Sequence, residues 1–323
     1  MKVAIIGTGL AGLRCGQVLQ AAGVSVSWFE KSRAVAGRMS AKRLWGGHVD
    51  LGAQYFTARD PAFIQQVRHW QQAGLVAPWL GKVYRYQDSC LAASPGSELR
   101  YVGIPAMHSP LRSALPDASI QLNCCITELH YTDSWHLTAA DGSQFAGFDQ
   151  LVLAIPPAQA HALLAADTDL QQQLPSQLLL PCHAVAMQLS QPIRHEAAAI
   201  FVRQGPLSWV ARQGSKPGRL TELEQWVLHF SADYSQQHLD ASADDLMTVA
   251  TVELSTMLAE PVQVQDSYHH RWLYASVAAE VEQPGLLRSD HLPCMVIGDW
   301  CFGGRIENAW LAGQAAAEEV LNG

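Results

Sequence analysis

The stretch VAIIGTGLAG at residues 3–12 decides the fold. Its first part, residues 3–6, is a short β-branched run that predicts a buried strand. Residues 10–22 follow with the apolar periodicity of a helix, and VSVSWFE at residues 24–30 predicts a second strand. The first thirty residues therefore predict one β-α-β unit with a right-handed connection.

Three glycines and one acid give this unit the pattern of a dinucleotide-binding site. Gly7 permits a tight turn, Gly9 lets a pyrophosphate approach the backbone, and Gly12 lets the helix pack closely on the strand. The unpaired amide donors at the helix start then face the anion. Glu30 ends the second strand, where it can accept hydrogen bonds from adenosine ribose hydroxyls. Both NAD and FAD suit such a unit.

Two further segments favour FAD. Arg38 lies just beyond the second strand in KSRAVAGRMS, residues 31–40, where its guanidinium can pair with a pyrophosphate. Asp299 lies at a strand end in VIGDWCFGGRIENAWLAGQAAAEEVL, residues 296–321, where it can accept from a ribityl hydroxyl. The helix that follows can stabilise negative charge on a reduced flavin. An NAD domain has no need of this terminal segment, so the sequence predicts FAD.

Composition and charge narrow the function classes. The 323 residues are 49% hydrophobic and 15% charged, which is ordinary for a globular protein of about two domains. The net charge of -8, without a basic run, argues against nucleic acid or an anionic membrane as partner. No apolar run reaches the roughly 20 residues of a membrane span.

Cysteine and histidine usage adds three expectations. Seven cysteines without a CxxC pair predict a reduced, cytoplasmic protein, and Cys301 is expected to be a buried thiol rather than a covalent flavin attachment. The thirteen histidines lack metal-site spacing, so no metal is expected. The residues imply no protein partner.

The secondary structure predicted for the middle of the chain differs from that predicted for its ends. Buried strands at 151–155 and 295–299 and a long helix from about Ile306 to Leu321 continue the α/β pattern of the N-terminus. A helix is expected at about 242–259. Long antiparallel strands are expected at 183–190, 207–212, 225–232 and 262–276.

These elements predict an α/β protein in which a second, mostly antiparallel β-sheet domain is inserted into a discontinuous nucleotide-binding domain. The expected FAD-binding domain comprises residues 1–62, 102–160 and 290–323. The expected substrate domain comprises residues 63–101 and 161–289.

Six segments together resemble the flavin-dependent amine oxidase superfamily, and within it the bacterial renalases. They are GTGLAG (7–12), EKSRAVAGRMS (30–40), DLGAQYFTARD (50–60), SWVARQGSKPGR (208–219), HRWLYA (270–275) and GDWCFGGRIENAWLAGQ (298–314). The resemblance covers essentially the whole chain and implies a Rossmann-type FAD domain like that of hydroxybenzoate hydroxylase. It also implies non-covalent FAD contacts from Gly7, Gly9, Ala11, Gly12, Glu30, Lys31, Arg38, Gln54, Tyr55, Ile126, Asp299 and Ile306.

The chain departs from the family pattern at two positions. Ala36 replaces a second glycine before the Gly-Arg pair, which is tolerable if the backbone dihedrals there are ordinary. His183 stands where related sequences tend to carry a large aromatic residue, so it bears on the shape of the pocket.

Aromatic and basic residues are candidates for a substrate cavity. In the strand from residue 262, Tyr268, His270, Trp272 and Tyr274 alternate and so project from one face. That stripe suits either a packed core or a cavity wall over the flavin. Arg212, and with it Arg59, can meet a substrate phosphate. The candidate substrate-binding residues are Tyr55, Phe56, Thr57, Arg59, Trp209, Arg212, Trp272 and Tyr274.

The lysines bear on the reaction. Flavin oxidases of amines typically place a lysine near the hydride-accepting nitrogen, and none of Lys2, Lys31, Lys42, Lys82 and Lys216 has a clear claim to that role. Hydride loss from a dihydropyridine gives an aromatic pyridinium directly, so that reaction needs no base.

The resemblance implies an FAD-dependent oxidase that converts 2- or 6-dihydro isomers of NAD(P)H to NAD(P)+, a repair reaction. Its partners would be this dinucleotide and dioxygen, which is reduced to hydrogen peroxide. Two alternatives stay open, namely an oxidase of a small amine or a ring desaturase, and a non-catalytic FAD-binding protein.

Overall fold

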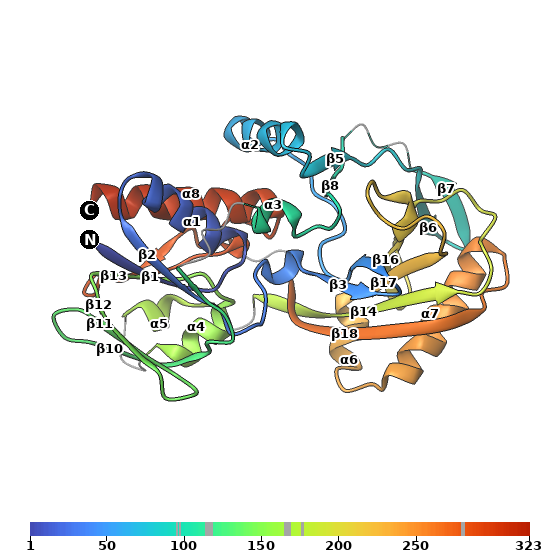
Figure 1. Ribbon diagram of the computed structural model, residues 1–323. Helices are drawn as coiled ribbons and strands as arrows, with labels where there is room; N and C mark the ends of the chain where they lie inside the picture. The colour runs from blue at the N-terminus through green and yellow to red at the C-terminus, as the bar shows by residue number, and fades with distance from the viewer. Residues whose placement is uncertain (95, 97, 114–118, 165–168, 176–177, 279–281) are drawn as a thin grey trace.

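The computed structural model describes residues 1–323 except 95, 97, 114–118, 165–168, 176–177 and 279–281. Two sheets form the two halves of an elongated molecule (Figure 1). Both termini lie in the half that contains the six-stranded sheet, and the seven-stranded sheet forms the other half.

The six-stranded sheet has the order β19-β20-β13-β1-β2-β9. At its centre β1 (Lys2–Ile6) pairs in parallel with β2 (Ser25–Phe29) and β13 (Gln150–Leu153). Such a sheet is covered on both faces, which explains the continuous apolar run of β1. The outer strands are β9 (Ile120–Gln121), β20 (Cys294–Val296) and the antiparallel β19 (Leu287–Arg288).

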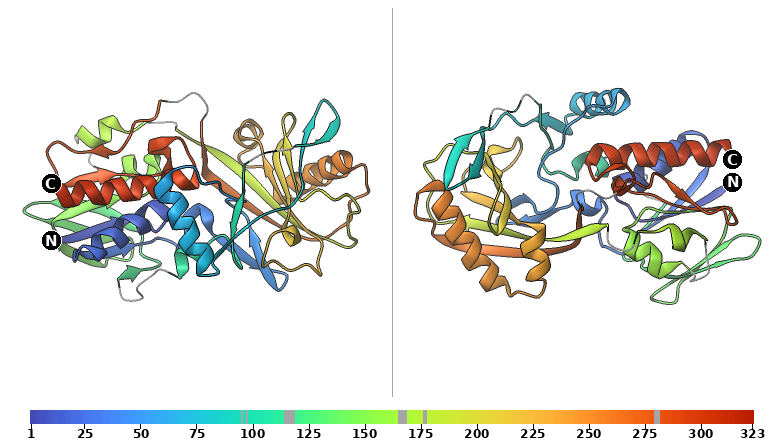
Figure 2. Two further views of the ribbon diagram at one scale, coloured as in Figure 1. Left: turned by 90° about the horizontal axis from the view of Figure 1, so that it is seen from above. Right: turned by 180° about the vertical axis from the view of Figure 1, so that it is seen from behind.

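Two helices from opposite ends of the chain cover one face of this sheet. α1 (Leu10–Ala21) and α8 (Ile306–Asn322) lie side by side (Figures 1 and 2), with Gly313 close to the carbonyl of Ala11. A Cβ on Gly313 would lie 2.3 Å from that oxygen. The small sheet β10 (Ile126–Tyr131), β11 (Trp135–Ala139) and β12 (Gln144–Phe148) belongs to the apolar cluster on the other face.

The seven-stranded sheet supplies the second half. Its order is β18-β14-β17-β16-β15-β6-β7. The long strands β14 (Leu179–Leu189) and β18 (Val264–Val277) are antiparallel neighbours. The other strands are β6 (Val83–Gln87), β7 (Cys90–Ala93), β15 (Ala199–Val202), β16 (Leu207–Arg212) and β17 (Gln225–Phe230).

The two faces of this sheet have different partners. Val185 and Met187 of β14 pack with α7 (Ala243–Leu258), and α6 (Ala232–Gln237) lies on the same side. Ala186 faces the opposite way and packs with Val49 and Leu51 near the hairpin β3 (Ala41–Leu44) and β4 (Gly47–Asp50). We call this second side, which carries Ala184 and Ala186, the inner face.

The remaining elements are short helices and strands packed around the two sheets or between them. They are η1 (Gly37–Met39), α2 (Pro61–Gln72), β5 (Val76–Pro78), β8 (Tyr101–Gly103), α3 (Ser109–Arg112), α4 (Pro157–Leu163), α5 (Asp169–Gln173), η2 (Gln213–Ser215) and η3 (Asp299–Phe302).

The fold class expected from the sequence is confirmed, and most expected elements occur within a few residues of their predicted ends. β14 begins at Leu179, four residues before the expected strand, and the expected strand 295–299 ends at Val296. β19, which precedes the expected boundary at 290, still belongs to the six-stranded sheet. The exact domain division stays a prediction.

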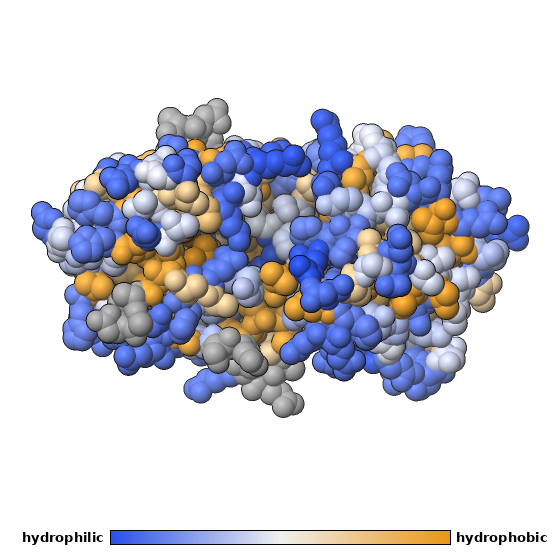
Figure 3. Space-filling model, turned by 90° about the horizontal axis from the view of Figure 1, so that it is seen from below, coloured by the Kyte–Doolittle hydropathy of each residue, from blue (hydrophilic) through white to orange (hydrophobic). Residues whose placement is uncertain are grey.

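All seven cysteines are free in the structure. In the parts of the chain that the structure describes, no helix has the length and apolar character needed to cross a membrane. On the face seen in Figure 3, apolar residues gather in separate patches among hydrophilic ones.

An alanine at position 36 was expected to be tolerable if its backbone dihedrals were ordinary, but they are not. Its φ is +98° and ψ is -5°, in the left-handed region that favours glycine, and its side chain is 1% exposed. Its amide donates to the carbonyl of Thr8 over 3.0 Å, which fixes the loop against the glycine turn. The alanine therefore holds a strained backbone in a buried place.

We predict a small effect on stability for one substitution at this position and a large loss for another. Ala36→Gly relieves strain of about 1–2 kcal/mol, but loses about 0.8 kcal/mol of methyl burial and about 0.4–1 kcal/mol of chain entropy. Stability should therefore stay within about 1 kcal/mol of the starting protein. Ala36→Val should cost more than about 2 kcal/mol, because a branched side chain there is both strained and overpacked. Thermal unfolding of both variants checks this, and equal midpoints would contradict it.

Candidate functional site

The glycine turn after β1 has the geometry of a dinucleotide-binding loop. Gly7 has a φ of +101°, and its amide donates to the carbonyl of Phe29 over 2.8 Å. A Cβ on Gly12 would lie 2.2 Å from the Gly7 oxygen, so α1 can approach β1 only with glycine there. A Cβ on Gly9 would meet nothing within 4 Å. The space in front of Gly9 is open, as the approach of a pyrophosphate requires.

Glu30 is held in a fixed orientation at the end of β2. One carboxylate oxygen accepts from the Thr8 amide over 3.0 Å and from the Thr8 hydroxyl over 2.7 Å. The other accepts from the Ser32 amide over 2.9 Å. The side chain is buried, yet each oxygen retains acceptor capacity for a ribose hydroxyl.

Arg38 and Asp299 form an ion pair across the two terminal segments. The Arg38 guanidinium also donates to the Ala275 carbonyl over 3.2 Å. Asp299 lies in η3, two residues before Cys301, whose thiol pKa burial raises to about 12. The two predicted cofactor anchors therefore lie in direct contact at the end of β20.

The N-termini of two helices complete the predicted cofactor site. α1 begins after Gly9 and α8 after Arg305, and neither has a side chain that caps its first amides. Ile306 is the first residue of α8, Ala11 is buried in α1, and Ile126 is buried at the start of β10, whereas Lys31 is exposed. Uncapped amides and an open glycine turn fit a dinucleotide with a flavin at its far end.

The segment after β4 connects this site to the inner face. A Cβ on Gly52 would lie 2.1 Å from the Arg38 carbonyl, and the Ala53 amide donates to that carbonyl over 2.9 Å. The Leu51 carbonyl accepts from Trp272 Nε1 over 3.1 Å and is 2.9 Å from His229 Nε2. Backbone from the first half of the molecule therefore lies directly against side chains of the second.

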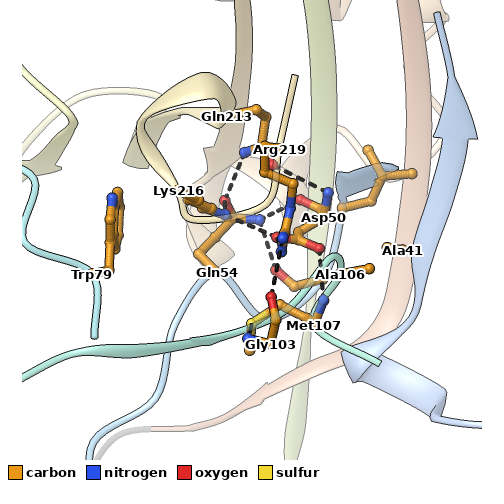
Figure 4. Close-up of polar contacts among 12 residues, drawn as sticks. Ala41, Asp50, Gln54, Trp79, Gly103, Ala106, Met107, Gln213, Lys216 and Arg219 are labelled. Carbon is orange, nitrogen blue, oxygen red and sulfur yellow. Dashed lines mark hydrogen bonds and ion pairs between the residues drawn. The ribbon is translucent and has the colours of Figure 1, made fainter. Parts of the chain in front are cut away.

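A buried polar cluster around Asp50 fixes this segment (Figure 4). One Asp50 oxygen lies 2.6 Å from the Arg219 guanidinium and 3.2 Å from Lys216 Nζ, and the other accepts from the Met107 amide over 3.1 Å. Lys216 also donates to Gln54 Oε1 over 2.9 Å. We call Asp50, Gln54, Gln213, Lys216 and Arg219 the Asp50 cluster.

Burial and close pairing together determine the pKa values of Asp50 and Lys216 in the Asp50 cluster. The side chains of Asp50, Lys216 and Arg219 are 0% exposed. Burial opposes ionisation of Asp50, but the two adjacent cations bring its pKa below the usual value. Burial lowers the pKa of Lys216 to about 8, and Asp50 opposes this shift. Lys216 therefore has a structural partner for its charge, although the sequence showed only a turn at this position.

The aromatic stripe of β18 lies on the inner face. Tyr268, His270 and Trp272 are register partners of Ala186, Ala184 and Cys182, so these three side chains share that face. The register shifts between Trp272 and Ser276, and Tyr274 lies within this irregular part.

Two more residues extend the inner face toward the centre of the sheet. Trp209 and His229 are register partners, and His229 pairs in turn with Ala184. Burial lowers the pKa of His229 to about 4, so the ring is neutral at pH 7. His183 lies on the opposite face, 3.0 Å from the His238 carbonyl and 2.9 Å from His269, so it does not shape the inner face.

Among the aromatic substrate-binding candidates, Tyr55 and Trp209 lie at the inner face, whereas Phe56 lies in the apolar core. Tyr55 and Trp209 lie together, with ring centres 5.2 Å apart. Phe56 is 4% exposed and packs against Phe63, Trp70 and Tyr101, which makes it a core residue in the structure.

Both candidate arginines already have partners. The Arg59 guanidinium pairs with Glu98 at 2.5 Å. Arg212 pairs with Glu224 at 3.0 Å and donates to two carbonyls, of Ile193 and His195. Thr57 is partly buried and lies two residues before Arg59 in the chain. The positions of Arg59 and Arg212 therefore give little support to a phosphate role, which stays a prediction.

Comparison with known proteins gives the family. A family model described as flavin containing amine oxidoreductase matches residues 82–321, and one described as an NAD(P)-binding Rossmann-like domain matches residues 5–70. The chain belongs to the flavin-containing amine oxidoreductases. Mouse renalase is 23% identical over 340 residues, which cover 99% of this chain and 98% of that protein. The chain is thus a renalase-like, FAD-dependent oxidoreductase.

Solved structures of similar fold are more distant in sequence. A putative protoporphyrinogen oxidase from Exiguobacterium sp. 255-15 has a TM-score of 0.80 and 12% identity, covering 100% of this chain and 99% of that one. A variant of putrescine oxidase has a TM-score of 0.75 and 13% identity, covering 99% and 98%. These similarities support the fold.

Two glycines of the family's nucleotide motif should respond differently to an added methyl group. Gly12→Ala should destabilise the protein even without FAD, because its Cβ would overlap the Gly7 carbonyl. Gly9→Ala should fold normally and lose FAD affinity, because its Cβ enters the space left for the pyrophosphate. Thermal unfolding of the apoprotein and titration with FAD separate the two effects. Similar losses of apoprotein stability in both variants would contradict this assignment.

Removing the central charge of the Asp50 cluster should be costly. Asp50→Asn keeps the side-chain shape but leaves two buried cations without a carboxylate, which should lower the free energy of unfolding by about 3–5 kcal/mol. The matched control is Glu196→Gln, which breaks the exposed Lys82–Glu196 pair and should cost less than about 1 kcal/mol. Thermal unfolding at pH 7 measures both, and a loss for Asp50→Asn no larger than the control's would refute the role given to Asp50.

Proposed function

We propose that the protein oxidises 2- or 6-dihydro isomers of NAD(P)H to NAD(P)+, with dioxygen as electron acceptor. The full-length similarity to renalase supports this proposal, and the inner face adds a physical argument. FAD, held non-covalently by the residues of the candidate site, would supply the redox chemistry, namely uptake of a hydride and return of two electrons to dioxygen. The balanced reaction takes one dihydro dinucleotide, one proton and one dioxygen to one oxidised dinucleotide and one hydrogen peroxide.

The observation that carries the proposal is that, among the described residues, the histidines and lysines at the inner face are poor proton acceptors. Burial and the charge of Lys42 lower the pKa of His270. His229 is a weak base because its pKa is about 4. Lys216 is bonded within the Asp50 cluster, and Lys42 donates to the Tyr268 hydroxyl over 2.6 Å. An amine substrate must lose its ammonium proton before oxidation, whereas a dihydropyridine needs to lose only a hydride.

The chain's own residues would bind and orient the substrate ring. Tyr55, Trp209 and Trp272 provide flat apolar surfaces close to the segment that carries Gly52 and Gln54. Rings held between such surfaces have few orientations, and hydride transfer needs the donor carbon at about 3–3.5 Å from its acceptor. Orientation would therefore contribute more to the rate than acid or base catalysis.

Anaerobic stopped-flow absorbance tests the proposal. The holoenzyme's flavin band should bleach within seconds on mixing with 6-dihydroNAD or 2-dihydroNAD. Ordinary NADH and simple monoamines should act far more slowly. Rapid bleaching by an amine such as putrescine, with none by either dihydro isomer, would favour the amine-oxidase alternative. No bleaching by any compound would favour a non-catalytic flavoprotein.

A further inference from the structure

Three arginine side chains surround Phe201 at one end of the inner face. Arg85 and Phe201 are register partners in β6 and β15, so their side chains share this face. The guanidinium carbon of Arg203 lies 5.4 Å from the Phe201 ring centre, and that of Arg100 lies 5.7 Å from it. We call Arg85, Arg100 and Arg203 the arginine cluster.

Arg100 is the member that lies nearest to the substrate-binding candidates. Its guanidinium carbon is 5.3 Å from the ring centre of Tyr55, and Trp209 contacts both Tyr55 and Phe201, with ring centres 5.2 and 4.7 Å away. Arg100 therefore lies where the aromatic wall of the inner face ends.

The backbone around Arg100 is firmly placed. Its carbonyl accepts from the Trp79 amide over 2.8 Å. The next residue, Tyr101, exchanges two backbone hydrogen bonds with Phe56, of 2.8 and 2.9 Å. Because Phe56 directly follows Tyr55, these bonds tie Arg100 to the segment that leads from Gln54. The backbone of Arg100 is thus fixed before any ligand binds, and its guanidinium lies near the rings of Tyr55 and Phe201.

The charge of Arg100 lies near aromatic rings but has no anionic partner among the described residues. Over the residues that the structure describes, its guanidinium has no ion pair and no hydrogen bond, and its Nε is buried. Trp209 is 7% exposed and its Nε1 is likewise a buried donor without a partner. A buried donor left unsatisfied costs about 1–3 kcal/mol, a cost that a bound acceptor removes.

We propose that Arg100 binds the phosphate groups of the dinucleotide substrate, with Arg203 beside it. This inference rests on the proposed function, in which the reacting ring lies near Gly52 and its pyrophosphate lies one ribose away. A guanidinium presents two parallel donors to a phosphate, and an anion on a protein of net charge -8 needs such a local cation. Arg100 takes the role that the sequence suggested for Arg59 and Arg212.

A comparison of substrates with and without phosphate tests Arg100. Arg100→Gln should raise KM for 6-dihydroNAD about 10- to 100-fold and change kcat little. The same variant should oxidise the 6-dihydro isomer of nicotinamide riboside, which has no phosphate, with KM within about twofold of the starting enzyme's. Arg100→Lys keeps the charge without the fork and should recover part of the loss.

A binding measurement gives a readout that is independent of turnover. Calorimetry should show that NAD+, which keeps the pyrophosphate, binds the Arg100→Gln holoenzyme about 10- to 100-fold more weakly. Arg68→Gln is the matched control, because it removes the same charge from an exposed position on α2. FAD content and the thermal midpoint show whether each variant is folded.

Each outcome points to one conclusion. A loss confined to the phosphate-bearing compounds supports Arg100 as the phosphate-binding residue. Equal losses for dinucleotide and riboside, or no loss for either, overturn that role. A starting enzyme whose flavin neither dihydro isomer reduces overturns the proposed function instead, and this result is obtained before any variant is compared.

Discussion

The architecture of the site depends on one buried carboxylate. Asp50 ends β4, and it is bonded to the turn that contains Met107 and to the loop that contains Lys216 and Arg219. These three segments are far apart in the sequence. Because a buried charge requires compensation at close range, the segments can dock in few other ways. The backbone from Leu51 to Gln54 is thereby placed between the inner face and the half of the molecule that contains the six-stranded sheet, which we call the nucleotide half.

Local patterns were sufficient to predict the nucleotide half. β1, α1 and β2 follow from an apolar run, a glycine turn and a helical period, all of which act over a few residues. The place of Glu30 at the end of a strand also predicts an acceptor for a ribose hydroxyl, and the structure holds its carboxylate in a fixed orientation. The backbone conformation of Ala36 was not predictable, since nothing in the residue itself indicates a positive φ.

In the half that contains the seven-stranded sheet, the partner of each charged side chain was not predictable, because these pairs depend on contacts between distant segments. Arg59, Arg100 and Arg212 look alike in the sequence, yet Glu98 neutralises the first and Glu224 the last. Lys216 appeared to lie in an ordinary turn, although the motif SKPGR was a signal that the loop is specialised. The burial of this lysine beside an aspartate can be recognised only in the folded structure.

The contact between α1 and α8 has a consequence for biosynthesis. α8 covers α1 through the close approach at Gly313, so the first helix lacks its main packing partner until α8 has been synthesised. The N-terminal unit therefore cannot complete its apolar packing from its own residues, although N-terminal regions of many proteins can fold first. Because the expected FAD contacts include Gly9 before α1 and Ile306 at the start of α8, a complete FAD site requires both helices to be in place.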